Sequence, residues 1–234
     1  MMNRLIRALL AMKDRLIGAA FIAAVLIPTY FFIPGDYFQQ VFYFCMAWSI
    51  GEILSTMMLR PFAGRLRTAG MLQIAALYLA LIFCIFLRKQ EIAFVVIASF
   101  LSDTGAFAFG KLIGKHKATL VSKISPNKTI EGYIGGAIFP LLALPIGWLI
   151  GIHFEITIAL IAYLLLSGLI AEIGDLLGSA TKRELGMKDS GEVLWNVPVA
   201  KWIEYPLKGM GGYLDRVDSI SLGIVLFTII VPRQ

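Results

Sequence analysis

The segment AEIGDLLGSATKRELGMKD carries acidic and basic side chains at helical spacing. Steps of three, four and three residues place Glu172, Asp175, Ser179 and Lys182 on one stripe of a helix, with Arg183 beside it. Carboxylates bind divalent cations, whereas lysine, arginine and hydroxyl groups bind phosphate oxygens. A salt-bridged helix end that emerges into water would explain any single pair of these residues, but not the whole stripe. The stripe therefore indicates phosphoryl chemistry, with a metal ion at its acidic end.

A second acidic pair lies near the C-terminus, in KGMGGYLDRVDS. Asp215 and Asp218 are three residues apart, with Arg216 between them and Gly211 and Gly212 shortly before. Mg²⁺ takes one or two protein carboxylates and completes its shell with water and substrate phosphate, and glycine lets the backbone approach phosphate closely. Two acidic helix ends are therefore expected to share one or two cations that a nucleotide bridges.

A third polar segment covers residues 102–136. Asp103 enters it from an apolar run, lysines follow, and Ser125 and Lys128 lie in a polar turn before the next apolar run. Lysine binds phosphate as a point charge, and a serine hydroxyl is a suitable second partner. We therefore expect Lys128 and Ser125 at a phosphate, and Asp103 orienting a lysine or a metal-bound group.

Transmembrane helices must position these residues. The chain has 234 residues, of which 59% are hydrophobic and 15% charged, with a mean hydropathy of +0.81; an ordinary soluble domain has about 25% charged residues. The alternation typical of strands is absent, and backbone groups in lipid must be satisfied within each segment, so the predicted class is all-α. We expect a single membrane domain, with N-terminal transmembrane helices in residues 1–90 and the catalytic region in residues 91–234.

Apolar runs predict about seven spans. The last run is short for a bilayer about 30 Å thick, so its helix is expected to begin earlier, near Tyr213, or to tilt. The runs are Leu16 to Ile33, Phe38 to Met58, Met71 to Leu87, Ile92 to Phe109, Tyr133 to Ile152, Phe154 to Gly174 and Ile220 to Val231.

The basic residues predict the orientation of the chain in the membrane. Alternation of seven spans puts 18 of the 21 lysines and arginines on one side. By the positive-inside rule, the N-terminus and both long polar loops are cytoplasmic in an inner, cytoplasmic-type cell membrane. Because topology alone demands this basic face, the net charge of +6 does not argue for a nucleic-acid partner.

Four motifs stand in order across most of residues 99–221: SDTGAFAFGKLIGKHK, SPNKTIEGYIGG, GDLLGSATKRELGMKD and GGYLDRVDS. Together they resemble the phosphatidate cytidylyltransferase family. The resemblance implies transfer of a cytidylyl group from CTP to phosphatidic acid or a related lipid phosphate, with membrane lipids around it and a homodimer as a family property. It also implies a role for Lys188 and Asp189, which continue the family signature.

The acidic and basic residues of these segments agree with this chemistry, because an anionic phosphate that attacks a polyanionic nucleotide needs charge neutralisation more than it needs a base. We expect Mg²⁺, with room for a second cation, as the cofactor. The metal ligands are expected to be Asp175, Asp215 and Asp218. The remaining substrate contacts are expected from Lys182, Arg183, Lys128, Ser179, Ser125, Glu172, Asp103, Lys188, Asp189, Gly211, Gly212 and Arg216.

The chain departs from the family pattern at two places. The histidine of the usual Pro-Gly-His-Gly-Gly element is missing, since Met210 stands before Gly211, and residues 190–208 hold an aromatic insertion. The insertion is expected to lie in the headgroup region. Three alternatives stay open: the same chemistry on another lipid phosphate, a non-catalytic lipid-binding relative, and an ion-coupled transporter. The acidic residues cluster at helix ends rather than at mid-membrane, which disfavours the transporter.

Overall fold

The computed structural model describes residues 24, 27–59, 68–118, 125, 128–184 and 214–232. Within these ranges the chain is helical, and its only β-contact is an isolated antiparallel bridge between Lys117 and Thr129. The all-α prediction is therefore confirmed for this part of the chain. The helices are α2 (Gly35–Leu59), α3 (Thr68–Cys84), α4 (Lys89–Leu112), α5 (Ile130–Ile138), the 3₁₀ turn η2 (Phe139–Leu142), α6 (Ala143–Leu149), α7 (Ile158–Glu184) and α9 (Leu214–Ile230).

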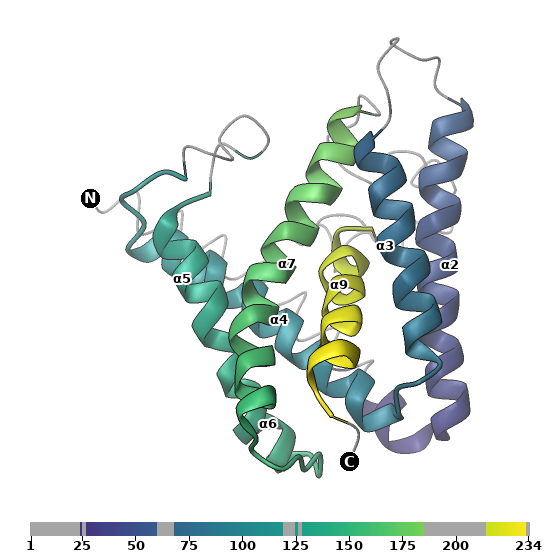
Figure 1. Cartoon of the computed structure of the whole chain (residues 1–234), viewed down its shortest axis with the longest axis vertical. Helices are drawn as coiled ribbons and strands as arrows, with labels where there is room; N and C mark the ends of the chain where they lie inside the picture. Colours follow the sequence, from purple (N-terminus) through teal and green to yellow (C-terminus); the bar gives the residue numbers. More distant parts are fainter. Residues whose placement is uncertain are drawn as a thin grey trace.

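In Figure 1, α2 and α7 run up, α3 and α9 run down, and α4 crosses the bundle obliquely; α9 packs against both α7 and α3. At one end of α7, Gly174 lies against Asp218 of α9; at the other end, the rings of Tyr163 and Phe227 are 4.9 Å apart. The helices α7 and α9 are therefore antiparallel. One end of the bundle therefore holds the C-terminal ends of α4 and α7 and the N-terminal ends of α5 and α9.

Aromatic packing closes the opposite end. The ring of Phe94 in α4 lies 4.8 Å from that of Phe154, which in turn lies 6.0 Å from Phe227 in α9. Offset and edge-to-face ring pairs of this kind add to the free energy gained from burial. The end of the bundle opposite the start of α9 is therefore apolar and packed with aromatic rings.

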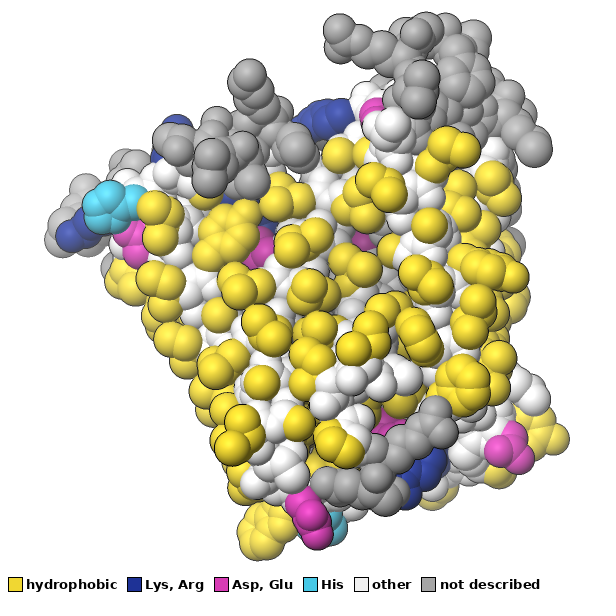
Figure 2. Space-filling model, viewed as in Figure 1, with side chains coloured by type: hydrophobic (Ala, Val, Ile, Leu, Met, Phe, Trp, Pro, Cys, Tyr) yellow, Lys and Arg dark blue, Asp and Glu magenta, His cyan; other side chains and the backbone are white. Residues whose placement is uncertain are grey.

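Among the described residues, three helical segments are long and apolar enough to cross a membrane: Lys89–Leu112, Ile130–Leu149 and Ile158–Glu184. Two shorter apolar helices are Thr68–Cys84 and Val217–Ile230. Figure 2 shows hydrophobic side chains over most of the visible face, with most charged side chains toward its two ends. Large apolar side chains that point outward, such as Trp148 at 70% exposed, are typical of helices that face lipid. The count of seven spans stays a prediction.

The helix boundaries differ from the predicted spans in two ways. The run Tyr133 to Ile152 is divided at η2, because Pro140 has no N–H to donate to the carbonyl of Gly136 and so interrupts the α-helical pattern. Helix α7 extends ten residues past the predicted end at Gly174, to Glu184. The last helix begins at Leu214, which agrees with the earlier start allowed near Tyr213.

Candidate active site

Helix α7 carries the whole predicted stripe and leads it from the interior to the surface. Glu172 is buried, Asp175, Ser179 and Lys182 are half-buried, and Arg183 is exposed. Because α7 is continuous to Glu184, the acidic and basic groups stay on one rigid element. Carboxylates therefore lie deeper in the bundle than the cations that follow them.

Lys128 joins the two acidic residues of this stripe. Its Nζ lies 2.6 Å from Asp175 Oδ2 and also pairs with Glu172 Oε2. Its side chain is 21% exposed, against 4% for Glu172 and 37% for Asp175. Burial disfavours the ammonium ion, but attraction to Asp175 and Glu172 outweighs that effect and raises the pKa of Lys128 above its usual value. Lys128 is therefore a charged group that neutralises part of the acidic pair.

Backbone hydrogen bonds fix Lys128 just before α5. Ala118 N–H donates to Lys128 O at 3.0 Å, and Ile130 N–H donates to His116 O at 2.9 Å. Thr129 then caps α5, since its hydroxyl oxygen accepts from Gly132 N–H at 3.1 Å. The polar turn is thereby held against the start of the helix, with the lysine directed to α7.

Small residues let α5 and α7 approach closely enough for this contact. A Cβ at Gly168 of α7 would overlap the carbonyl oxygen of Gly136 in α5, and a Cβ at Gly136 would lie 3.6 Å from Glu172 Oε1. Larger side chains would separate the helices and pull Lys128 away from its partners. The spacing of small residues is therefore what brings the third polar segment to the stripe.

Asp218 of α9 packs against α7 beside the stripe, at Gly174 and Gly178. Its side chain is 0% exposed, and its Oδ1 accepts a hydrogen bond from the N–H of Ser219 at 2.6 Å. A Cβ at Gly178 of α7 would overlap Asp218 Oδ2, so this carboxylate packs against α7 about one helical turn beyond Asp175. The structure thus brings the second acidic element to the first.

The structure describes only some of the other predicted site residues. Asp103 is half-buried in α4, and the carbonyl of the half-buried Ser125 accepts from Lys128 N–H at 3.4 Å. Asp215 and Arg216 belong to α9, but their side chains are not among those described. Lys188, Asp189, Gly211 and Gly212, as well as the insertion at 190–208, lie outside the described residues.

The donors that the structure does place fit a hard cation. Asp175, Asp218 and Glu172 offer carboxylate oxygens, which are the ligands that Mg²⁺ prefers. Among the described side chains there is no group of three or more acidic, histidine or cysteine residues close enough to form a complete metal site. A metal ion would therefore take one or two of these carboxylates and complete its shell with water and phosphate.

Sequence reasoning missed two features of this end of the bundle. The sequence predicted that the acids bind a metal ion and that Lys128 binds phosphate, but it did not predict that Lys128 pairs with Glu172 and Asp175. It also overlooked Glu184, whose carboxylate accepts hydrogen bonds from the first residues of α3. A signal for it exists, because an acid in the last turn of a helix opposes the helix dipole and so favours a partner elsewhere.

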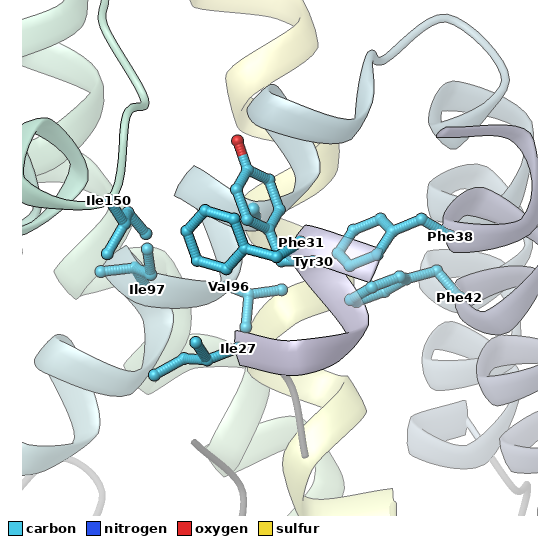
Figure 3. A pocket seen from close by; sticks show the side chains of 9 residues that line it. Ile27, Tyr30, Phe31, Phe38, Phe42, Val96, Ile97 and Ile150 are labelled. Atoms are coloured by element: carbon cyan, nitrogen blue, oxygen red, sulfur yellow. The ribbon is translucent and has the colours of Figure 1, made fainter. Parts of the chain in front are cut away.

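A separate apolar pocket lies at the opposite end of α4 (Figure 3). Ala93, Val96 and Ile97 come from the first turns of α4, far along that helix from the Asp103 end. The described residues that line it carry no charged group that could bind a phosphate. Its lining residues are Ile27, Tyr30, Phe31, Phe38, Phe42, Ala93, Val96, Ile97 and Ile150.

Comparison with known proteins relates the whole chain to one family. The model of a family described as "Cytidylyltransferase family" matches residues 2–232. The chain is 40% identical over 143 residues to a protein of Staphylococcus aureus (strain COL) named phosphatidate cytidylyltransferase, covering 61% of this chain and 48% of that protein. A protein of the same name from Staphylococcus haemolyticus is 41% identical over 143 residues, with the same coverage. The chain thus spans about half the length of the curated relatives it matches.

Proposed function

Because the chain belongs to the cytidylyltransferase family, we propose that it transfers a cytidylyl group from CTP to the phosphate of phosphatidic acid. The products are CDP-diacylglycerol, which stays in the membrane, and pyrophosphate. The relatives named phosphatidate cytidylyltransferase support this choice of substrates.

The observation that carries the proposal is the contact of Lys128 with Glu172 and Asp175 of α7, the helix against which the buried Asp218 also packs, at Gly174 and Gly178. Acids from two helices and a cation from a third segment meet at one end of an apolar bundle. A nucleotidyl transfer between two anions needs such a mixture, since positive charge must offset repulsion while acids hold a divalent cation.

The reaction makes one bond and breaks one. A phosphate oxygen of the lipid forms a bond to the α-phosphorus of CTP, and the bond from that phosphorus to the bridging oxygen of the β-phosphate breaks. Pyrophosphate leaves with the electron pair. At pH 7 a phosphomonoester is already largely ionised, so no side chain has to remove a proton from it.

The side chains supply position and charge. Lys128, Lys182 and Arg183 hold phosphate oxygens, Ser179 and Ser125 add hydrogen bonds, and Asp103 supports this group. Lys188, Asp189, Gly211, Gly212 and Arg216 complete the nucleotide contacts. Asp175, Asp215 and Asp218 hold Mg²⁺, with Glu172 close by, and a bound Mg²⁺ supplies Lewis-acid stabilisation of the charge on the phosphates.

The proposal includes a place in the membrane. Seven spans would put the N-terminus and this end of the bundle on the cytoplasmic side, where CTP is available. The basic loops support this orientation, since they follow the ends of α4 and α7.

The test is pyrophosphate release by the purified protein in detergent, with CTP, Mg²⁺ and phosphatidic acid. A panel of other lipid phosphates runs beside it, and Asp36→Asn serves as a control acid, exposed in the first turn of α2. Release with phosphatidic acid, at a rate that Asp36→Asn does not change, supports the proposal. Release only with another lipid phosphate changes the substrate, and CTP binding without release on any lipid would sink the catalytic assignment.

A further inference from the structure

The hydroxyl of Tyr133 is buried and makes no hydrogen bond to any described residue. Tyr133 lies in α5, one turn beyond the capping residue Thr129, and its oxygen has no hydrogen-bond partner among the residues that the structure describes. Burial of a hydroxyl without a partner costs free energy, so the group calls for an explanation.

The position of Tyr133 in α5 places it near Lys128 and its two partners, Glu172 and Asp175. Gly136, three residues further on the same face of α5, lies against Glu172. Helices α5 and α7 are antiparallel, so a step back from Gly136 to Tyr133 in α5 corresponds to a step forward from Glu172 to Asp175 in α7. Tyr133 therefore lies at the level of those two acids. Electrostatic interactions of the phenol with Glu172, Lys128 and Asp175 agree with this placement.

Lys128 occupies both carboxylates in this structure. If Lys128 binds a substrate phosphate, as the proposed function requires, it must loosen its hold on them. The carboxylate of Glu172, at 4% exposed, would then be a buried negative charge with less positive charge beside it, which costs free energy. A hydrogen-bond donor nearby would lower that cost.

We propose that Tyr133 is a positioning residue whose hydroxyl donates a hydrogen bond to the Glu172 carboxylate when Lys128 turns to a substrate phosphate. The inference rests on the proposed function. Tyr133 acts through Glu172, which lets Lys128 turn to the substrate, and it does not touch the reacting atoms. Among the described residues its hydroxyl has no partner, because Lys128 already pairs with the Glu172 carboxylate.

The first test is the dissociation constant of CTP with Mg²⁺ for the full chain in detergent, measured together with the melting temperature. Tyr133→Phe removes one oxygen and leaves the ring. We expect CTP to bind about tenfold more weakly, since a hydrogen bond to a charged group is lost. The melting temperature should stay the same or rise, because an unpartnered hydroxyl is removed.

A matched control is Tyr163→Phe. Its hydroxyl is also buried without a described partner, but its ring packs on Phe227 at the other end of α7. This change should leave the CTP affinity unaltered.

The second test repeats Tyr133→Phe in a Glu172→Gln background. Because a neutral amide carries no charge to compensate, we expect no further loss of CTP affinity there. The same tenfold loss in that background would place the action of the hydroxyl elsewhere and overturn the inference. A lower melting temperature with unchanged affinity would show a purely structural role.

The outcome for the unaltered chain separates the two proposals. If it binds CTP and Tyr133→Phe binds equally well, the inference alone fails. If the unaltered chain binds no CTP, the proposed function fails and takes the inference with it.

Discussion

The carboxylate of Glu184, the last residue of α7, accepts a hydrogen bond from the backbone N–H of Ala69 at 3.1 Å. Gly70 N–H donates to the same carboxylate at 3.2 Å, and the Thr68 hydroxyl at 3.4 Å. An acid at the start of a helix satisfies N–H groups that have no intrahelical partner and interacts well with the dipole. This contact ties the end of α7, which carries Lys182 and Arg183, to α3.

Replacement of Glu184 should loosen that end of the bundle. Glu184→Ala removes three acceptor contacts, and we expect the free energy of unfolding to fall by about 1–2 kcal/mol. Denaturant titration in mild detergent measures it. Thr68→Ala, which removes only the longest of the three hydrogen bonds, should cost less than Glu184→Ala. Equal losses for the two variants would contradict the capping role.

Removal of the Lys128 charge should harm both stability and turnover. Lys128→Met leaves Glu172 and Asp175 without their shared cation. A fully buried broken pair costs about 3–5 kcal/mol, but Asp175 is 37% exposed, so we expect about 2 kcal/mol. Turnover should fall at least about 100-fold. Lys111→Met, in the last turn of α4, is the control and should leave both quantities nearly unchanged.

The contribution of Lys128 should be constant through neutral pH. Its pKa is raised in the folded chain, so the stabilisation is fully present below the ordinary lysine value of 10.5 and is lost only as the pH rises through the higher folded value. The difference in unfolding free energy between the unaltered chain and Lys128→Met should therefore not change between about pH 7 and 9. A difference that declines across this range would show that Lys128 loses its proton there.

Metal removal should stop turnover reversibly. We expect EDTA to abolish pyrophosphate release and Mg²⁺ to restore it, because the carboxylates of the site need a cation to face phosphate. Asp175→Asn should lower the rate at least about 100-fold and raise the Mg²⁺ concentration for half-maximal rate. Asp175→Asn with full activity and unchanged Mg²⁺ dependence would refute its role as a ligand.

Gly178 should not tolerate a side chain. Gly178→Ala would push a methyl group into the carboxylate of Asp218, and we expect a loss of about 1–3 kcal/mol, as in other overpacked interfaces. Gly51 in α2 has open space around it, so Gly51→Ala should be neutral or stabilising by up to about 1 kcal/mol. Melting temperatures of the two variants in the same detergent provide the comparison.

The sequence predicted the helical class and the residues of the stripe, for reasons that are local. Apolar runs and the absence of alternation specify helices that face lipid. The steps from Glu172 to Lys182 specify one face of one helix, whatever packs against it. The run Tyr133 to Ile152 predicts one span, and the segment Ile130–Leu149 is long and apolar enough to be one, with Pro140 marking a local interruption within it.

Tertiary structure alone decided which groups meet. Lys128 and Glu172 are 44 residues apart, and nothing in their local pattern says that they form a pair. Their contact depends on the close approach of α5 to α7 at Gly136 and Gly168, and Asp218 joins them because α9 packs on Gly178. A one-dimensional pattern fixes the face on which a side chain lies, whereas the distance between two faces is set by how the helices pack.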